Sequence, residues 1–109
     1  METIEIIRDR SASLLASNNV AFAGVFGSVA RGEDRPESDV DILVRFDSPK
    51  SLIDIIGLEE ELSHALDRDV DLVTERSLCP HIRDEVFRDL KTLIEDIPAL
   101  KKEIGNNTK

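Results

Sequence analysis

Residues 20–44, VAFAGVFGSVARGEDRPESDVDILV, hold two apolar segments on either side of a polar stretch. Each apolar segment predicts a strand, one over Val20–Phe26 and one over residues 39–46, because both runs are short and rich in β-branched or aromatic residues. The residues between them begin with Gly27 and Ser28, predict a short helix and continue as a polar loop. Only 11 residues separate Ser28 from Asp39. For the end of the first strand and the start of the second to share a site, the two strands must run antiparallel.

Two acidic residues, Asp39 and Asp41, lie at the start of the second predicted strand, where Asp is unusual. Residues two apart on a strand face the same side, with Cα atoms roughly 6.5 Å apart, so both carboxylates point into one small region. Like charges at this spacing raise each other's pKa or require a cation. Oxygen ligands of this kind suit Mg²⁺ or Mn²⁺. Asp-x-Asp alone is also typical of solvated strand ends, so its surroundings must distinguish the two interpretations.

Gly27 and Ser28 are the neighbouring feature that favours a site. They end a buried strand and open a helix, where backbone N–H groups and the helix dipole favour a phosphate, and Arg31 follows one turn later. Residues 27–32 also match the first part of a P-loop, but Glu33 and Asp34 stand where that loop has Lys and Ser or Thr. Two acids there would repel phosphates, so we reject the P-loop. An ordinary turn explains the glycine and serine alone, whereas their proximity to two carboxylates predicts a phosphate cradle beside a metal site.

The remaining pattern predicts an α/β domain with the order α-β-α-β-α-β-α. Apolar residues recur at helical spacing over residues 4–15, 48–66 and 80–94, with Ser48 and Pro49 as the cap and first turn of the second of these helices. Residues 70–73 predict a third strand, in which Asp69 and Asp71 flank Val70. We expect a single domain over residues 1–109, with residues 105–109 frayed.

Composition restricts the partners and the compartment. Fourteen Lys and Arg residues against 23 Asp and Glu residues give a formal net charge of −9, which argues against long nucleic acid, whose binding relies on neutralising phosphates. A triphosphate that carries Mg²⁺ remains compatible, because the ion supplies local positive charge. No apolar run approaches the ~20 residues of a membrane span. The N-terminus lacks the pattern of a secretory signal and Cys79 is the single cysteine, so we expect a cytoplasmic protein with no membrane partner.

Three segments carry a family resemblance. Residues 27–32 (GSVARG) with 38–44 (SDVDILV) resemble the signature of the DNA polymerase beta-type nucleotidyltransferase superfamily, and more narrowly of the minimal nucleotidyltransferases. Those are short antitoxins often encoded beside a HEPN-domain toxin. Residues 68–73 (RDVDLV) resemble the family's third-carboxylate strand, with Asp71 at the matching position, and residues 80–85 (PHIRDE) resemble the opening of its last helix. The resemblance implies the nucleotidyltransferase fold, a small mixed sheet of three to four strands flanked by helices.

The resemblance also implies roles for individual residues. Asp39 and Asp41 would bind two divalent ions, Mg²⁺ or alternatively Mn²⁺, and Asp71 would complete one site and help to deprotonate the acceptor hydroxyl. Gly27 and Ser28 would hold the β- and γ-phosphates of ATP, with Arg31 beside them as a further nucleotide-binding residue. In toxin-paired members the reaction transfers AMP from ATP to a tyrosine of the HEPN toxin, which silences the toxin. The chain would thus be an antitoxin acting on a HEPN partner.

Two alternatives stay open: a non-catalytic antitoxin that inhibits its partner by occlusion, and a nucleotidyltransferase that modifies small molecules. The second is less favoured, because 109 residues leave no room for the helical domain with which larger relatives hold their acceptor. We expect the apolar face of the last helix to dock the partner unless that face is core, and the sequence leaves a homo- or hetero-oligomer open.

Two residue patterns look like further sites. Asp69 shares a face with Asp71 but lies nearer the start of the strand, so we interpret it as a solvated neighbour. Arg76 and His81 match R-x4-H, a pattern associated with HEPN ribonucleases, which carry the pair within one helix. Pro80 would disrupt such a helix, so we interpret this match as coincidental.

Overall fold

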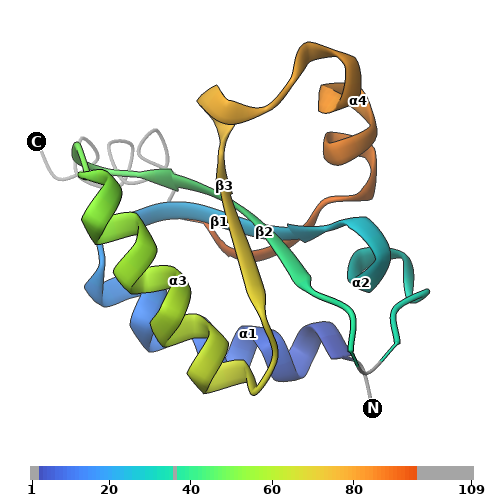
Figure 1. The fold of residues 1–109 in the computed structure, drawn as a ribbon, viewed down its shortest axis with the longest axis horizontal. Coiled ribbons are helices and arrows are strands. Elements are labelled where there is room, and N and C mark those ends of the chain that lie inside the picture. The colour runs from blue at the N-terminus through green and yellow to red at the C-terminus, as the bar shows by residue number, and fades with distance from the viewer. Residues whose placement is uncertain (1–2, 36, 96–109) are drawn as a thin grey trace, which may run out of the picture.

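A computed structural model describes residues 3–35 and 37–95 of the chain (Figure 1). The elements follow the order α1 (Thr3–Ser17), β1 (Val20–Phe26), α2 (Gly27–Arg31), β2 (Val40–Phe46), α3 (Leu52–Leu66), β3 (Val70–Thr74), the short 3-10 helix η1 (Glu75–Ser77), α4 (Pro80–Asp89) and β4 (Lys91–Glu95). The expected frayed tail, residues 105–109, lies outside the described residues. Among those described, no helix combines the length and the apolarity that crossing a bilayer requires.

The four strands form one mixed sheet in the order β3-β2-β1-β4. β1 runs antiparallel to both β2 and β4, whereas β2 and β3 are parallel. The antiparallel pairing of the first two strands confirms the prediction made from the short segment between Ser28 and Asp39. The α/β class and the small mixed sheet are confirmed as well.

The two faces of the sheet are covered differently. Figure 1 shows α1 and α3 lying together on one side, with α4 apart from them. Val40, Ile42 and Val44 of β2 face the α1–α3 layer and are fully buried in the main core. The alternating residue Leu43 belongs to a smaller cluster on the other face, with Val86 of α4. By the same alternation Asp41 lies on this second, less covered face.

The C-terminal part of the predicted last helix is a strand. The helix begins at Pro80 as expected but ends at Asp89 rather than Ile94, and Lys91–Glu95 pair with β1 as β4. Spacing of the apolar residues fitted a helix, but β1 would otherwise leave a row of backbone N–H and C=O groups unpaired at its outer edge. Gly24 of β1 makes room for the change of direction, since a Cβ there would lie 2.8 Å from Leu90 Cδ1.

The start of α3 also differs from the prediction. Ser48 and Pro49 precede the helix, and Ser51 is its N-cap. Ser51 Oγ accepts a hydrogen bond from the Asp54 N–H at 3.1 Å, and Asp54 Oδ2 accepts one from the Ser51 N–H at 3.3 Å. This reciprocal pair satisfies two backbone N–H groups at the start of α3.

Candidate active site

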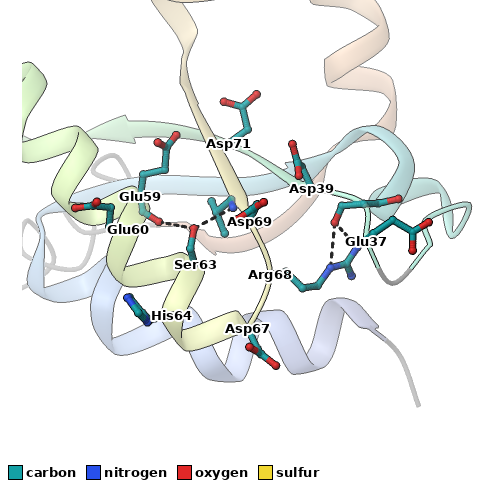
Figure 2. Close-up of a pocket in the computed structure, with 12 residues that line it drawn as sticks. Glu37, Asp39, Glu59, Glu60, Ser63, His64, Asp67, Arg68, Asp69 and Asp71 are labelled. Carbon is teal, nitrogen blue, oxygen red and sulfur yellow. Dashed lines mark hydrogen bonds between the residues drawn. The ribbon is translucent and has the colours of Figure 1, made fainter.

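The strand register brings the predicted carboxylates together. Asp41 of β2 pairs with Asp71 in the parallel ladder and with Phe26 in the antiparallel ladder, so one row crosses three strands. Gly27 follows Phe26 directly, and Asp39 immediately precedes β2. Figure 2 shows Asp39 and Asp71 projecting to the same side of the strands that carry them. The three aspartates and Gly27, which come from separate segments of the sequence, therefore lie around one point of the sheet.

Gly27 and Asp41 are in close contact. A Cβ at position 27 would lie 2.5 Å from Asp41 Oδ2, a distance that real side chains essentially never show. Gly27 also has φ +74°, in the left-handed region that favours glycine. From the sequence, this glycine was expected to let a phosphate approach the backbone. The structure adds a second reason, because the carboxylate of Asp41 occupies the space of a side chain there.

Within residues 3–35 and 37–95, the three carboxylates, those of Asp39, Asp41 and Asp71, form no ion pair. Burial raises the pKa of Asp41, and the negative charges of Asp71 and Asp39 raise it further, while Arg31 acts in the opposite direction. The site thus concentrates negative charge that no Lys or Arg of the described chain neutralises by direct contact.

Arg31 faces acidic partners of its own. Its Nε donates to Glu33 Oε1 and its Nη1 to Asp89 Oδ2, both at 2.9 Å, and these contacts raise the pKa of Arg31. The second pair ties α2 to the end of α4. Arg31 is near enough to lower the pKa of Asp41, and its two carboxylate contacts use two of the five guanidinium N–H donors. Its predicted role in nucleotide binding stays a prediction.

The edge strand that carries Asp71 is held by side chains of α3. Ser63 Oγ accepts a hydrogen bond from the Val70 N–H at 3.0 Å, and Glu59 Oε2 accepts one from the Leu72 N–H at 2.8 Å. These two N–H groups flank Asp71 on the side where β3 has no neighbouring strand. Neither Glu59 nor Ser63 was predicted from the sequence. Their spacing of four residues on a helix was the available signal, but it could not indicate which backbone they would meet.

The remaining candidates do not belong to the carboxylate row. Asp69 is exposed, in agreement with its interpretation as a solvated neighbour, although its backbone carbonyl accepts the Val40 N–H at 2.8 Å. Arg76 lies in η1 and His81 in α4, so the R-x4-H match does not lie within one helix. This arrangement supports its interpretation as coincidental.

Residues 11–98 match the family described as "Polymerase beta, Nucleotidyltransferase". The chain belongs to this nucleotidyltransferase family. Protein adenylyltransferase MntA of Thermococcus cleftensis is 43% identical to this chain over 91 residues, which cover 83% of this chain and 92% of the relative. The resemblance noted in the sequence, to the minimal nucleotidyltransferase antitoxins, is therefore confirmed.

Solved structures with the same fold include toxin–antitoxin complexes. A crystal structure of a toxin–antitoxin with AMP-PNP superimposes with a TM-score of 0.72 at 30% identity, covering 84% of this nucleotidyltransferase and 76% of that chain. A complex of a tri-AMPylated Shewanella oneidensis HEPN toxin with an MNT antitoxin gives a TM-score of 0.67 at 26% identity, covering 94% of this chain and 79% of that one. The fold and the enzyme class thus agree with those expected from the sequence.

The carboxylates of this nucleotidyltransferase suit a Mg²⁺ ion that is also bound by the phosphate oxygens of the substrate. Within residues 3–35 and 37–95, no three His, Cys, Asp or Glu side chains are arranged as a ready-made metal site. Mg²⁺, however, is usually bound through one or two carboxylates together with phosphate oxygens and waters. Asp41, whose charged form is disfavoured by burial and by Asp71 and Asp39, is a carboxylate that a cation would relieve.

Two cavities flank the carboxylates of the nucleotidyltransferase. One, of about 890 Å³, extends from Asp39 and Asp71 along α3 and is lined mainly by acidic residues (Figure 2). The other, of about 490 Å³, lies between α2 and α4 and is lined by Gly27, Arg31 and the apolar Ile82, among others. The first cavity thus borders Asp39 and Asp71, and the second borders Gly27.

Proposed function

We propose that this nucleotidyltransferase transfers AMP from ATP to a tyrosine hydroxyl of a partner HEPN toxin and so acts as its antitoxin. The observation that carries the proposal is the row of Asp41 and Asp71 in cross-strand register, with Asp39 and Gly27 beside it. The relative named protein adenylyltransferase and the AMPylated toxin in a structurally similar complex support AMP as the transferred group and a HEPN toxin as its acceptor.

The family resemblance implies the proposed role of each residue, and the observed positions are compatible with these roles. Asp39 and Asp41 would hold Mg²⁺ or Mn²⁺ at two sites, and Asp71 would complete one of them. When bound, such ions neutralise the triphosphate and the charge on the attacking and leaving oxygens. Gly27 and Ser28 would hold the β- and γ-phosphates through the backbone at the start of α2.

The proposed reaction is a displacement at the α-phosphorus of ATP. The acceptor oxygen forms a bond to the α-phosphorus of ATP, the bond from that phosphorus to the bridging oxygen breaks, and pyrophosphate leaves. The proton of the acceptor hydroxyl moves toward the carboxylate of Asp71, which is exposed at the edge strand and therefore accessible to an incoming hydroxyl. The products are the AMP-modified acceptor and pyrophosphate.

Isotope transfer from ATP to a co-expressed, co-purified partner tests this proposal. We expect label on the partner from α-labelled ATP with Mg²⁺ and none from γ-labelled ATP. The double variant Asp39→Asn/Asp41→Asn and chelation by EDTA should abolish the label. No label from either position, with partner binding unchanged in the double variant, would instead favour the occluding antitoxin. Label in a small product rather than in protein would favour the small-molecule enzyme.

A further inference from the structure

Arg68, between α3 and β3, binds the loop that leads to Asp39. Its Nε and Nη2 donate to the Ser38 carbonyl at 3.2 and 2.7 Å, and Nη2 also donates to the Arg35 carbonyl at 3.1 Å. Its Nη1 donates to Asp34 Oδ2 at 3.0 Å. Figure 2 shows Arg68 reaching from the start of β3 toward this loop. One guanidinium thus holds three points of the loop at once.

Asp39 needs such support because it lies beyond the strand ladder. The last cross-strand partners of β2 and β3 are Val40 and Val70. On the far side of Asp39, the peptide carbonyl of Ser38 is held by Arg68, and on the near side the Val40 N–H donates to the Asp69 carbonyl at 2.8 Å. The backbone on both sides of Asp39 is therefore fixed by consecutive residues of the segment that enters β3.

The charge of Arg68 is directed at Asp34 rather than at the site. The side chains of this pair are only 18% and 17% exposed, so the contact is largely shielded from solvent. Ion pairs within the described part of the chain join Arg68 to Asp34 and not to Asp39. Arg68 acts on Asp39 through the backbone, and Asp34 keeps its guanidinium in orientation.

We infer that Arg68 is a positioning residue, which sets the carboxylate of Asp39 relative to Asp41 and Asp71. The inference rests on the proposed function for its effect on catalysis, but its structural part stands on the hydrogen bonds alone. Loss of a residue that orients a metal ligand typically costs about 10- to 100-fold in metal affinity or activity. Lys at position 68 keeps the charge but lacks the fork that reaches Asp34 and both carbonyls together, so it should rescue only part of the loss.

The test compares Arg68→Ala and Arg68→Lys with Arg45→Ala, which removes another arginine ion pair, Arg45–Glu75, away from this loop. The rate of AMP transfer is measured against Mg²⁺ concentration. Two further measurements are made on the same proteins. The first is Mn²⁺ binding in the presence of a non-hydrolysable ATP analogue, and the second is amide exchange over residues 33–39. We expect the Mg²⁺ concentration for half-maximal rate to rise about tenfold in Arg68→Ala, less in Arg68→Lys and not at all in Arg45→Ala. Exchange should accelerate in residues 33–39 but not in β1.

Unchanged metal dependence and unchanged exchange in Arg68→Ala would overturn the inference. If Arg68→Ala also exchanges faster throughout β1, the substitution affects the whole fold. The same measurements on Arg68→Lys then decide whether Arg68 positions Asp39. A wild-type protein that transfers no AMP would refute the proposed function and not this inference. In that case Mn²⁺ affinity and exchange still decide it, since weaker Mn²⁺ binding with faster loop exchange supports it and wild-type values of both contradict it.

Discussion

At the scale of single residues, a comparison of Gly27 with Gly32 separates two reasons for a glycine at position 27. These are the positive φ and the close contact with Asp41. Both glycines have φ near +74°, but a Cβ at Gly27 meets Asp41 Oδ2, whereas a Cβ at Gly32 meets nothing within 4 Å. We expect Gly27→Ala and Gly32→Ala each to lower the free energy of unfolding by about 1–2 kcal/mol through backbone strain. Only Gly27→Ala should lose AMP transfer, because it displaces Asp41. Urea denaturation and transfer assays check this, and equal activity of the two variants would refute the role of the contact.

Asp41 predicts a dependence of stability on pH. The pKa of Asp41 is higher in the folded protein than in the unfolded chain. At pH values above the folded pKa, the ionised carboxylate of Asp41 therefore destabilises the fold. Asp41→Asn lacks that penalty, so the inactive variant should melt at a higher temperature than wild type at pH 7. The gain should disappear as the pH falls below about 4, where aspartates of the unfolded chain become protonated.

Thermal melts of wild type and Asp41→Asn from neutral to acidic pH provide the measurement. Asp9→Asn, on the exposed side of α1, is the control and should change stability by no more than about 0.5 kcal/mol. A stability gain in Asp41→Asn that grows on acidification would contradict the assignment.

Single residues also show how far sequence reasoning extends. Asp39 and Asp41 were predictable as a pair because alternation along a strand depends only on local geometry, whereas Asp71 was distinguished from Asp69 by the family resemblance. The roles of Glu33 and Asp34 were not, although both were noted as the acids that exclude a P-loop. Glu33 pairs with Arg31, and Asp34 pairs with Arg68, which is 34 residues away in the sequence. Such contacts depend on the loop conformation and on the packing of the whole fold.

At the scale of elements, β3 depends on α3 for the edge that faces away from β2. Glu59→Ala should leave the partly buried Leu72 N–H without its acceptor and lower the free energy of unfolding by about 1–3 kcal/mol. Glu61→Ala, at an exposed position of the same helix, should stay within about 0.5 kcal/mol. Urea denaturation of both variants measures the difference. Equal losses would show that Glu59 contributes helix propensity or charge rather than a clamp on β3.

β4 was beyond prediction for a related reason. Leu90, Leu93 and Ile94 follow the i, i+3, i+4 spacing of a helix, so the local pattern favoured a helix over a strand. The strand forms because β1 has a second edge to pair, which is a property of the assembled sheet. β1 itself coincides with its predicted bounds, since a short apolar run between turn residues has few alternatives.

At the scale of the whole molecule, α4 offers the surface expected to receive the partner. Val86 is buried against the sheet, whereas Ile82 is 44% exposed and lines the cavity that contains Gly27. The helix thus contributes residues both to the core and to the surface. The sequence alone did not decide whether its apolar face is core or a docking face. We expect Ile82→Ser to raise the KM for the protein acceptor with little change in stability. Ile53→Ser, which alters an exposed residue near the start of α3, is the control and should leave that KM unchanged. Equal effects on KM would argue against α4 as the docking face.

The most direct test of the central claim is the intact mass of the partner toxin after co-expression with wild type or with Asp41→Asn. The account predicts AMP-sized mass increases on the toxin with wild type, located on tyrosine by peptide mapping, and none with Asp41→Asn. A toxin that stays unmodified yet is inhibited equally by both proteins would contradict it, and would show that this nucleotidyltransferase acts on its partner by binding alone.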